Sequence, residues 1–414
     1  MHRIRFAGAL ALAVIWANSS FANEAPLTLA EAVSIAVTSD DPALLSFNES
    51  IAALKDQAVA DAQLPDPRIR GALANVPTDT FQVDQENMTQ VQFTLRQEFP
   101  SGRTLSLRGE RRQAEADAER ARRDLTLMEI RMAVRNRWFE KYYLVQAQAN
   151  IETSRHNVSE LVQALHAAFS AGSLSAQDIS RAELELALLD DRITEFRQRE
   201  EETDAELFRF LGKDALRPLS SKLPILQTLP DIAEMEAALL QHPSVLIEEV
   251  KVGIGDMDVA LAEQAYRPSW ALEGGYGARH GDRADLATIG ITLSIPLFTT
   301  DRQDRRLSAA VRQRGAAQFD RAAKLLDLRR DLVGAYAKWR RLGERIQLYG
   351  DVVIERAKET AEASVSTYAS GRSDFAELIR SQLAQLDAEL KHMRLATEQG
   401  KAWAKIRYLV GEMK

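Results

Sequence analysis

The chain has 414 residues, of which 27% are charged and 7% aromatic, and its formal net charge is −7. The 53 basic and 60 acidic residues leave no positive field that would favour nucleic acid. Cysteine is absent, which excludes disulfides, thiolate metal sites, a cysteine nucleophile and a lipid-modified cysteine. No apolar run reaches 18 residues, so we expect no transmembrane helix, and only β-strands could cross a membrane.

The first 22 residues predict a secretory signal peptide. His2, Arg3 and Arg5 precede an apolar stretch over 6–17, and Ser20-Phe21-Ala22 offers a small-x-small cleavage pattern. The alternative is an N-terminal core helix. Cleavage would remove two arginines, lower the net charge from −7 to −9, and leave a mature chain outside the cytoplasm.

The mature sequence is predicted to be a tandem duplication, because five motifs recur in order at offsets of 198–201 residues. We expect a first repeat over 23–216, a linker over 217–230 and a second repeat over 231–414. The paired motifs are Asp41-Pro42 with His242-Pro243, Pro67 with Pro268, Phe93-Thr94-Leu95 with Ile291-Thr292-Leu293, Phe169-x-x-Gly172 with Tyr368-x-x-Gly371, and Leu211-Gly212 with Val410-Gly411.

Long helices are expected where proline is missing. All twelve prolines fall within 26–100 or 218–296, and a proline in a helix interior costs ~3 kcal/mol. Each repeat should contain a short helix, a long helix of roughly 100 Å and a return helix after a glycine-bearing turn. Stacked end to end, the short and return helices should match the long one. The expected helices are 43–63, 103–168 and 174–211, and then 244–264, 302–367 and 373–409.

Two β-hairpins are expected between the short and long helices. Apolar residues alternate with polar ones over 91–99 and 289–297, with a partner strand over 270–277 and a more weakly patterned one near 68–76. Strands of about 10 residues suit a tilted membrane strand, although a soluble four-stranded sheet is the alternative. Four strands cannot close, and an open edge cannot face lipid, so several copies would have to pool their strands. Two copies would give eight strands, whose interior side chains fill, and three would give twelve, wide enough for a lumen. Long helices extending such a barrel would form a conduit.

These features resemble a TolC-type outer-membrane factor. The resemblance covers the mature chain and includes the Leu-Pro-Asp-Pro entry to the first hairpin at 64–67 and the two glycine-bearing turns. Met88-Thr89 and Gln97-Glu98-Phe99-Pro100 are similar to the heavy-metal branch, the outer component of cobalt–zinc–cadmium or copper–silver efflux systems. The resemblance implies a mainly α fold with a membrane β-barrel, as a homotrimer with a 12-strand barrel and a 12-helix periplasmic tunnel.

The resemblance also implies a place and partners. The channel would lie in outer-membrane lipid of a Gram-negative bacterium and dock onto a periplasmic adaptor and an inner-membrane resistance-nodulation-division pump driven by protons. Many relatives carry a lipid-modified cysteine, which this chain lacks. The expected function is a passive exit duct for heavy-metal cations. The alternatives are a duct for drugs or type I secretion and, in a different class, a soluble periplasmic coiled-coil adaptor or scaffold.

For the site, the resemblance implies a gate at the helical tip, marked by Gly172 and Gly371. By position after these turns, Asp178 and Glu377 match acidic gate residues of the family. An acidic ring in a narrow pore concentrates cations, and opposite charges across helices would hold the tip closed. The alternative is a solvated surface, whose ion pairs contribute ~0–1 kcal/mol. The neighbouring charges included in this candidate gate are Arg181, Arg372, Asp374 and Arg380.

No catalytic or metal-binding constellation is visible, so we expect no enzyme, no cofactor and no fixed metal site. His156 and His166 are ten residues apart, which places them ~80° apart around a helix. Mid-helix aromatic residues are expected to pack the bundle, whereas Trp270 and Tyr276 could form an interfacial girdle or pack the strands. The mid-helix group is Trp138, Tyr142, Tyr143, Tyr336 and Trp339.

Overall fold

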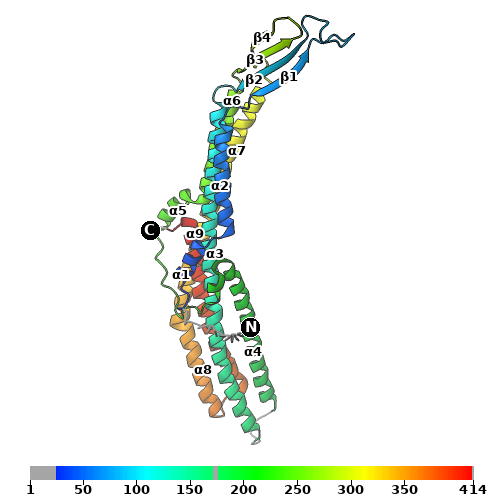
Figure 1. Ribbon diagram of the computed structural model, residues 1–414. Coiled ribbons are helices and arrows are strands. Elements are labelled where there is room, and N and C mark those ends of the chain that lie inside the picture. The colour runs from blue at the N-terminus through cyan, green and yellow to red at the C-terminus, as the bar shows by residue number, and fades with distance from the viewer. Residues whose placement is uncertain (1–24, 171–175, 413–414) are drawn as a thin grey trace, which may run out of the picture.

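The protein is an elongated rod in the computed structural model, which describes residues 25–170 and 176–412. A four-stranded sheet forms one end of the rod and two helical hairpins form the other (Figure 1). The predicted signal peptide and Gly172 lie outside the described residues.

The described elements follow the same order twice, and most predicted bounds are confirmed to within three residues. The short helices α1 and α5 were not predicted. The expected helix over 302–367 is interrupted by a π-helical segment, Tyr349–Val353, and the last strand ends at Ser294 rather than near 297. The first half contains α1 Leu29–Thr38, α2 Pro42–Asp61, β1 Arg68–Ala74, β2 Gln90–Phe99, α3 Thr104–Ser170 and α4 Ala176–Leu211; the second contains α5 Ile232–Ala238, α6 Pro243–Gln264, β3 Ser269–Arg279, β4 Leu286–Ser294, α7 Gln303–Leu348, α8 Ile354–Ala369 and α9 Phe375–Val410.

The predicted end-to-end stacking of short on return helices is confirmed, and the residues before Pro42 and Pro243 form the joints. Asp41 caps α2 by accepting a hydrogen bond from the Ala43 amide at 2.8 Å, and it also binds Arg209 near the end of α4 at 2.8 Å. His242 caps α6 by accepting from the Ser244 amide, and its ring packs edge-on against Tyr408 of α9. The continuous helix α3 runs alongside α2 and α4 (Figure 1).

The sheet is antiparallel in the order β1-β2-β3-β4, so the two hairpins join along β2 and β3. At that junction Phe99 stacks on Trp270 with ring centroids 4.0 Å apart. The outer strands β1 and β4 each have one neighbour within the described chain. The stacking on Phe99 shows that Trp270 of β3 packs against strand β2.

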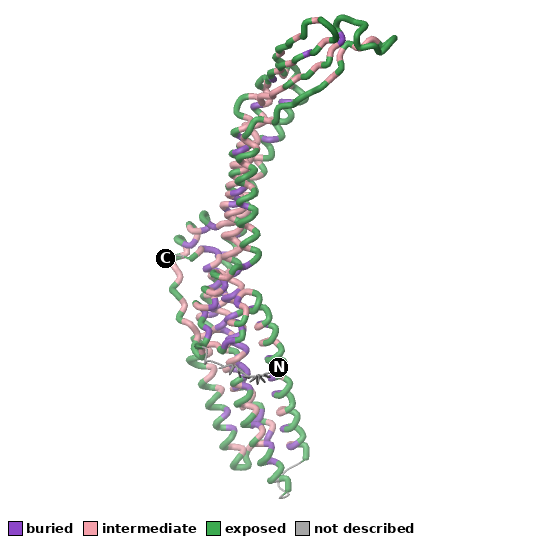
Figure 2. Tube along the Cα trace, in the orientation of Figure 1, coloured by how far each residue is buried: buried purple, intermediate pink, exposed green. Residues whose placement is uncertain are grey.

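The core occupies the middle of the rod, where buried residues gather between the helices (Figure 2). The side chains of Trp138, Tyr142 and Tyr143 are buried there, as predicted for the mid-helix aromatics, and the side chain of Phe139 is buried beside them. Helices α3 and α9 cross closely because Gly400 has no side chain, and a Cβ at this position would lie 2.5 Å from the Phe139 ring. Tyr336 and Trp339 of α7 are partly buried and pack against the same region.

Among the described helices, none combines the length and the apolar character that crossing a lipid bilayer requires.

Candidate functional site

The predicted gate residues lie at the end of the rod opposite the sheet, where the described parts of the two helical hairpins end. Asp178 is in the first turn of α4 and Arg181 follows one turn later, on either side of the buried residue Ile179. Gly371 ends the α8 hairpin arm with φ +70°, a left-handed conformation that favours glycine. Its amide donates to the carbonyl of Tyr368 at 2.9 Å, which closes the turn.

Asp374 begins helix α9. Its carboxylate accepts a hydrogen bond from the Glu377 amide at 2.9 Å, which satisfies one of the unpaired donors at the helix start. Loss of such a cap typically costs 0.5–2 kcal/mol, or about 1 kcal/mol. Asp374 therefore has a local structural role in addition to any role in a gate.

The other charges of the α8–α9 tip bond within their own hairpin. Arg380 pairs with Glu377 one turn earlier in α9, and both side chains are exposed. Arg372 donates from Nε to the hydroxyl of Ser370 at 3.0 Å. The ion pair that Glu377 makes thus lies within one helix, rather than across helices as we had expected for a closing contact.

Tyr368 of α8 packs on the apolar cluster that also contains Ile179 of α4 and Phe375 of α9. Burial raises the pKa of Tyr368, and the negative charge of Asp178 raises it further, so this charge acts on the end of α8. The Tyr368 ring in turn meets Phe375 edge-on, with centroids 6.0 Å apart. The start of α4, the end of α8 and the start of α9 therefore meet in one apolar cluster.

An apolar layer that the sequence analysis did not single out lies behind these charges. Phe375, Leu378 and Ile379 are buried and pack in one cluster with Ile179 and Ala182 of α4. Their i, i+3, i+4 spacing at the start of α9 was the available signal. The tip is consequently held together by apolar packing, with the charged side chains on its outside.

A buried serine pair also joins the two arms of the second hairpin. Ser381 of α9 donates to the hydroxyl of Ser364 of α8 at 2.5 Å, and Ser364 donates to the Ala361 carbonyl at 2.7 Å. Small side chains at these positions let α8 and α9 approach closely. Sequence reasoning missed this contact, because isolated serines in a helix give no periodic signal.

A cluster of charges around Glu140 links the three helices α3, α4 and α9 above the tip. The Glu140 carboxylate of α3 binds Arg199 of α4 at 2.8 Å and Arg394 of α9 at 2.9 Å, and it also pairs with Lys401 of α9. Burial by itself would raise the pKa of Glu140, but the hydrogen bonds from Lys401 and Arg394 outweigh burial and lower the pKa to about 2. Glu140 therefore stays ionised at any physiological pH.

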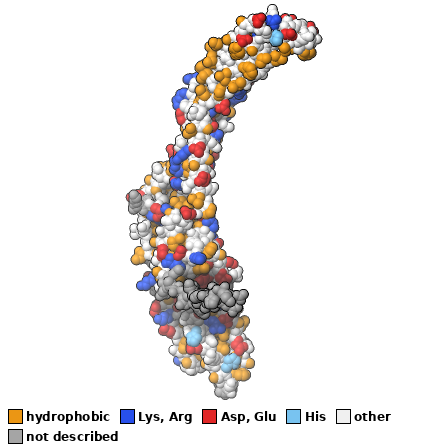
Figure 3. All heavy atoms as spheres, viewed as in Figure 1, with side chains coloured by type: hydrophobic (Ala, Val, Ile, Leu, Met, Phe, Trp, Pro, Cys, Tyr) orange, Lys and Arg blue, Asp and Glu red, His pale blue; other side chains and the backbone are white. Residues whose placement is uncertain are grey.

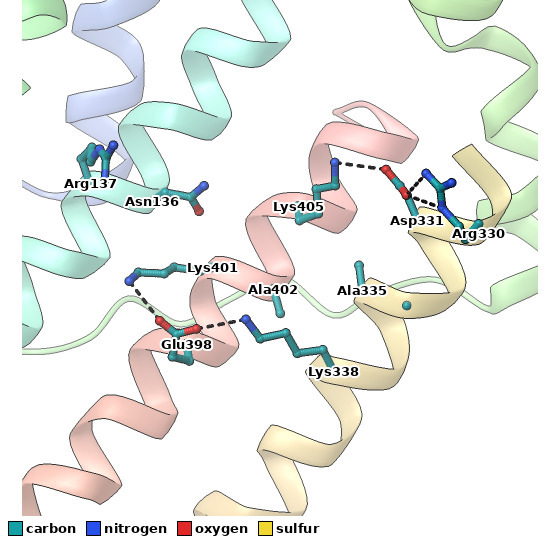
Figure 4. A pocket seen from close by; sticks show the side chains of 11 residues that line it. Asn136, Arg137, Arg330, Asp331, Ala335, Lys338, Glu398, Lys401, Ala402 and Lys405 are labelled. Carbon is teal, nitrogen blue, oxygen red and sulfur yellow. Dashed lines mark hydrogen bonds and ion pairs between the residues drawn. The ribbon is translucent and has the colours of Figure 1, made fainter. Parts of the chain in front are cut away.

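A groove of about 630 Å³ runs beside this cluster between α3, α7 and α9 (Figure 4). On its walls Glu398 bridges Lys338 and Lys401, each at 3.0 Å, while Asp331 pairs with Arg330. These acidic groups are held by the lysines and arginine beside them.

His156 and His166, in the part of α3 near the tip, do not come together at one site. His156 lies near Glu160 at 3.4 Å and His166 near Glu183 at 3.2 Å, and these pairs are separate. Within residues 25–170 and 176–412 no group of three or more histidine, aspartate or glutamate side chains is arranged to hold a metal ion.

The sequence of this chain is similar to those of known efflux proteins. Residues 235–412 match the family described as outer membrane efflux protein. The predicted resemblance to TolC-type outer-membrane factors is confirmed. The chain is 23% identical over 396 residues to the cobalt-zinc-cadmium resistance protein CzcC of Cupriavidus metallidurans, covering 93% of this chain and 90% of that relative.

The fold recurs in solved structures. A membrane protein from Pseudomonas aeruginosa superposes with a TM-score of 0.80 at 15% identity, over 92% of this chain and 90% of that one. CusC, whose structures address transmembrane channel formation, superposes with a TM-score of 0.78 at 14% identity over 92% of each chain. The expected mainly helical fold with a small antiparallel sheet is thereby confirmed. The matched family consists of efflux proteins, not enzymes, as predicted.

Proposed function

We propose that this chain is the outer-membrane exit channel of a heavy-metal efflux system, acting as a passive duct for metal cations. The resemblance to CzcC supports the class of substrate. The observation that carries the channel itself is the form of the molecule: a rod of packed helices that ends in an open, apolar-faced sheet.

The sheet has the two faces that a barrel wall between lipid and a lumen needs. Strand register places most of the large apolar side chains of all four strands on one face, where Ile289 is 85% exposed. Figure 3 shows this hydrophobic surface at the sheet end of the rod. The opposite face carries mainly polar side chains and glycines, together with Ala72, Ala271 and Leu286. The apolar face includes Ile69, Leu73, Val91, Phe93, Leu95, Leu272, Ile289, Ile291 and Leu293.

Open edges support a homotrimer. Strands β1 and β4 leave backbone donors and acceptors at the outer edges of the described sheet, and such edges are not tolerated in lipid. Three copies would supply twelve strands, enough to close around a lumen. Helix α7 also supports assembly of several copies, because it carries exposed apolar residues at the heptad-like spacing of a coiled-coil contact. These residues are Val311, Phe319, Leu326 and Val333.

In this proposal the helical tip is the gate. Asp178 and Glu377 would form an acidic ring that attracts cations, with Arg181, Arg372, Asp374 and Arg380 around it. A periplasmic adaptor and a proton-driven resistance-nodulation-division pump would open the tip, and the metal would pass without a fixed site. Selectivity among metals would then lie mainly in the pump and the adaptor.

Growth of a deletion strain tests the proposal directly. The strain, with and without the restored gene, is grown across a panel of divalent and monovalent metals and hydrophobic drugs. Sensitivity confined to metals and cured by the gene is expected, and the affected ion would name the substrate. Sensitivity to drugs alone would refute the metal assignment, and extraction of the protein without detergent would favour a soluble adaptor instead.

A further inference from the structure

The groove between α3, α7 and α9 carries more positive than negative charge. Its walls contain five basic and two acidic side chains, and its volume of about 630 Å³ has room for a small organic ion. These residues lie on three helices that are far apart in the chain, so no sequence motif predicted the groove. The basic side chains are those of Arg137, Arg330, Lys338, Lys401 and Lys405, and the acidic ones are those of Asp331 and Glu398.

The ion pairs inside the groove do not cancel this excess. Glu398 lies 3.0 Å from both Lys338 and Lys401, so one carboxylate serves two ammonium groups (Figure 4). Asp331 pairs with an arginine at 2.9 Å, and its other oxygen is 3.6 Å from Lys405, which is longer than a hydrogen bond. The remaining basic side chains have acidic partners outside the groove, which are Glu206 for Arg137, Asp327 for Arg330 and Glu140 for Lys401.

Lys338 and Lys405 are therefore the two cations of the groove that have no carboxylate of their own among the described residues. Their side chains are 55% and 37% exposed, so both ammonium groups can reach a molecule in the groove. One extends from α7 and the other from α9. An ion between them would be bound from two walls.

The charge of Lys405 also acts on a buried neighbour. Burial is the main cause that lowers the pKa of His242, and the positive charges of Lys405 and Lys324 lower it further. The same positive field that disfavours a second cation at His242 would stabilise an anion beside Lys405.

An amide on the α3 wall is also available to a bound molecule. Oδ1 of Asn136 is buried and has no hydrogen-bond partner within the part of the chain that the structure describes. An asparagine side chain can turn over, which exchanges its oxygen and its NH₂ group. The NH₂ group of Asn136 would then donate to an anion in the groove.

The groove opens on the face of the helical wall opposite to its covered face. The indole NH of Trp403 in α9 donates to the Gln227 carbonyl of the linker at 3.1 Å, and Trp138 of α3 bonds in the same way to the backbone before α1. Lys401 and Lys405 are each two residues from Trp403, which places them about 200° around the helix from it. Three copies of α1, α5 and the linker would fill a lumen, so in the proposed trimer the covered face is outside and the groove faces the lumen.

We infer that this groove binds a small multivalent anion, a polycarboxylate or a phosphate, from the lumen of the channel. The position in the lumen rests on the proposed function, whereas binding of the anion depends only on the groove. Lys338 and Lys405 would donate charge-assisted hydrogen bonds to the anionic oxygens. Three copies would give the duct a basic stretch between the acidic tip and the sheet, where an anion that accompanies the exported cations is held.

Isothermal titration calorimetry of the full-length protein in detergent tests the binding. Citrate and inorganic phosphate are the probes, in metal-free buffer of low ionic strength because salt screens such contacts. We expect at least one probe to bind, K338Q and K405Q each to weaken it about tenfold, and K405R to retain it. The matched control is K358Q, since Lys358 is exposed on α8 outside the groove.

The two probes distinguish the two kinds of anion, because tighter binding of citrate would assign a polycarboxylate and tighter binding of phosphate a phosphate. Binding of neither probe would overturn the inference. So would K338Q and K405Q variants that are folded by circular dichroism and bind as tightly as K358Q.

Currents through single channels in planar bilayers test the position in the lumen. We expect the anion that binds in calorimetry to reduce the current of the wild type and of K358Q, and to reduce that of K405Q less. Calorimetric binding without any effect on the current would refute a site in the lumen. A protein that forms no conducting channel would instead defeat the proposed function, and the calorimetry would still decide whether the groove binds an anion.

Discussion

Replacement of Glu140 by glutamine should be among the most damaging single changes in the helical wall. The carboxylate is 14% exposed and binds Arg199, Arg394 and Lys401, which come from two other helices. Glutamine keeps the shape and removes the charge, so three cations would surround a neutral amide. Removing one partner of a buried ion pair is costly because the remaining charges lose their compensation.

The magnitude follows from the pKa. A shift of the Glu140 pKa from 4.5 to about 2 corresponds to about 3 kcal/mol of stabilisation by the ionised form. A depressed carboxylate pKa stabilises the fold fully above the unfolded value. We expect E140Q to lose about 3 kcal/mol at pH 7, and the difference from wild type to shrink as the pH falls from 4.5 towards 2.

The assay is equilibrium unfolding in urea, followed by circular dichroism at several pH values. A matched control is E355Q, since Glu355 is exposed on α8 and a surface change is worth within about 0.5 kcal/mol. If E140Q unfolds like the control at pH 7, or if its deficit does not depend on pH, the reasoning from the ion cluster is wrong.

Three further predictions concern other parts of the chain. Burial lowers the pKa of His242 to about 4, so the imidazole gains its proton in the unfolded chain at a higher pH than in the folded one. The free energy of unfolding should therefore fall by up to about 3 kcal/mol as the pH drops from 6.5 to 4. The variant H242N can still cap α6, and in thermal unfolding it should show a smaller decline over this pH range. G400A should destabilise by about 1–3 kcal/mol in urea unfolding because the new Cβ meets the Phe139 ring, and an unchanged midpoint would contradict the close helix crossing. Neutralising Asp178 and Glu377 together should reduce cation over anion selectivity in planar bilayers, and unaltered reversal potentials would remove them from the gate.

The sequence by itself determined the elements of this protein. Proline-free stretches permitted helices of 67 and 36 residues, and alternation over 91–99 set the apolar face of β2, because both depend on residues close together in the chain. Gly371 marked a hairpin turn because a positive φ favours glycine at that point. The short helices α1 and α5 were missed, since ten and seven residues give too little periodicity.

Only the tertiary structure decided which elements meet. Glu140 finds its partners 59, 254 and 261 residues away, and no spacing rule connects positions so far apart. The pairing of β2 with β3 and the meeting of Ile179 of α4 with Tyr368 of α8 in one apolar cluster are of the same kind. The π-helical segment Tyr349–Val353, which interrupts the second long helix, was likewise not predicted from the sequence.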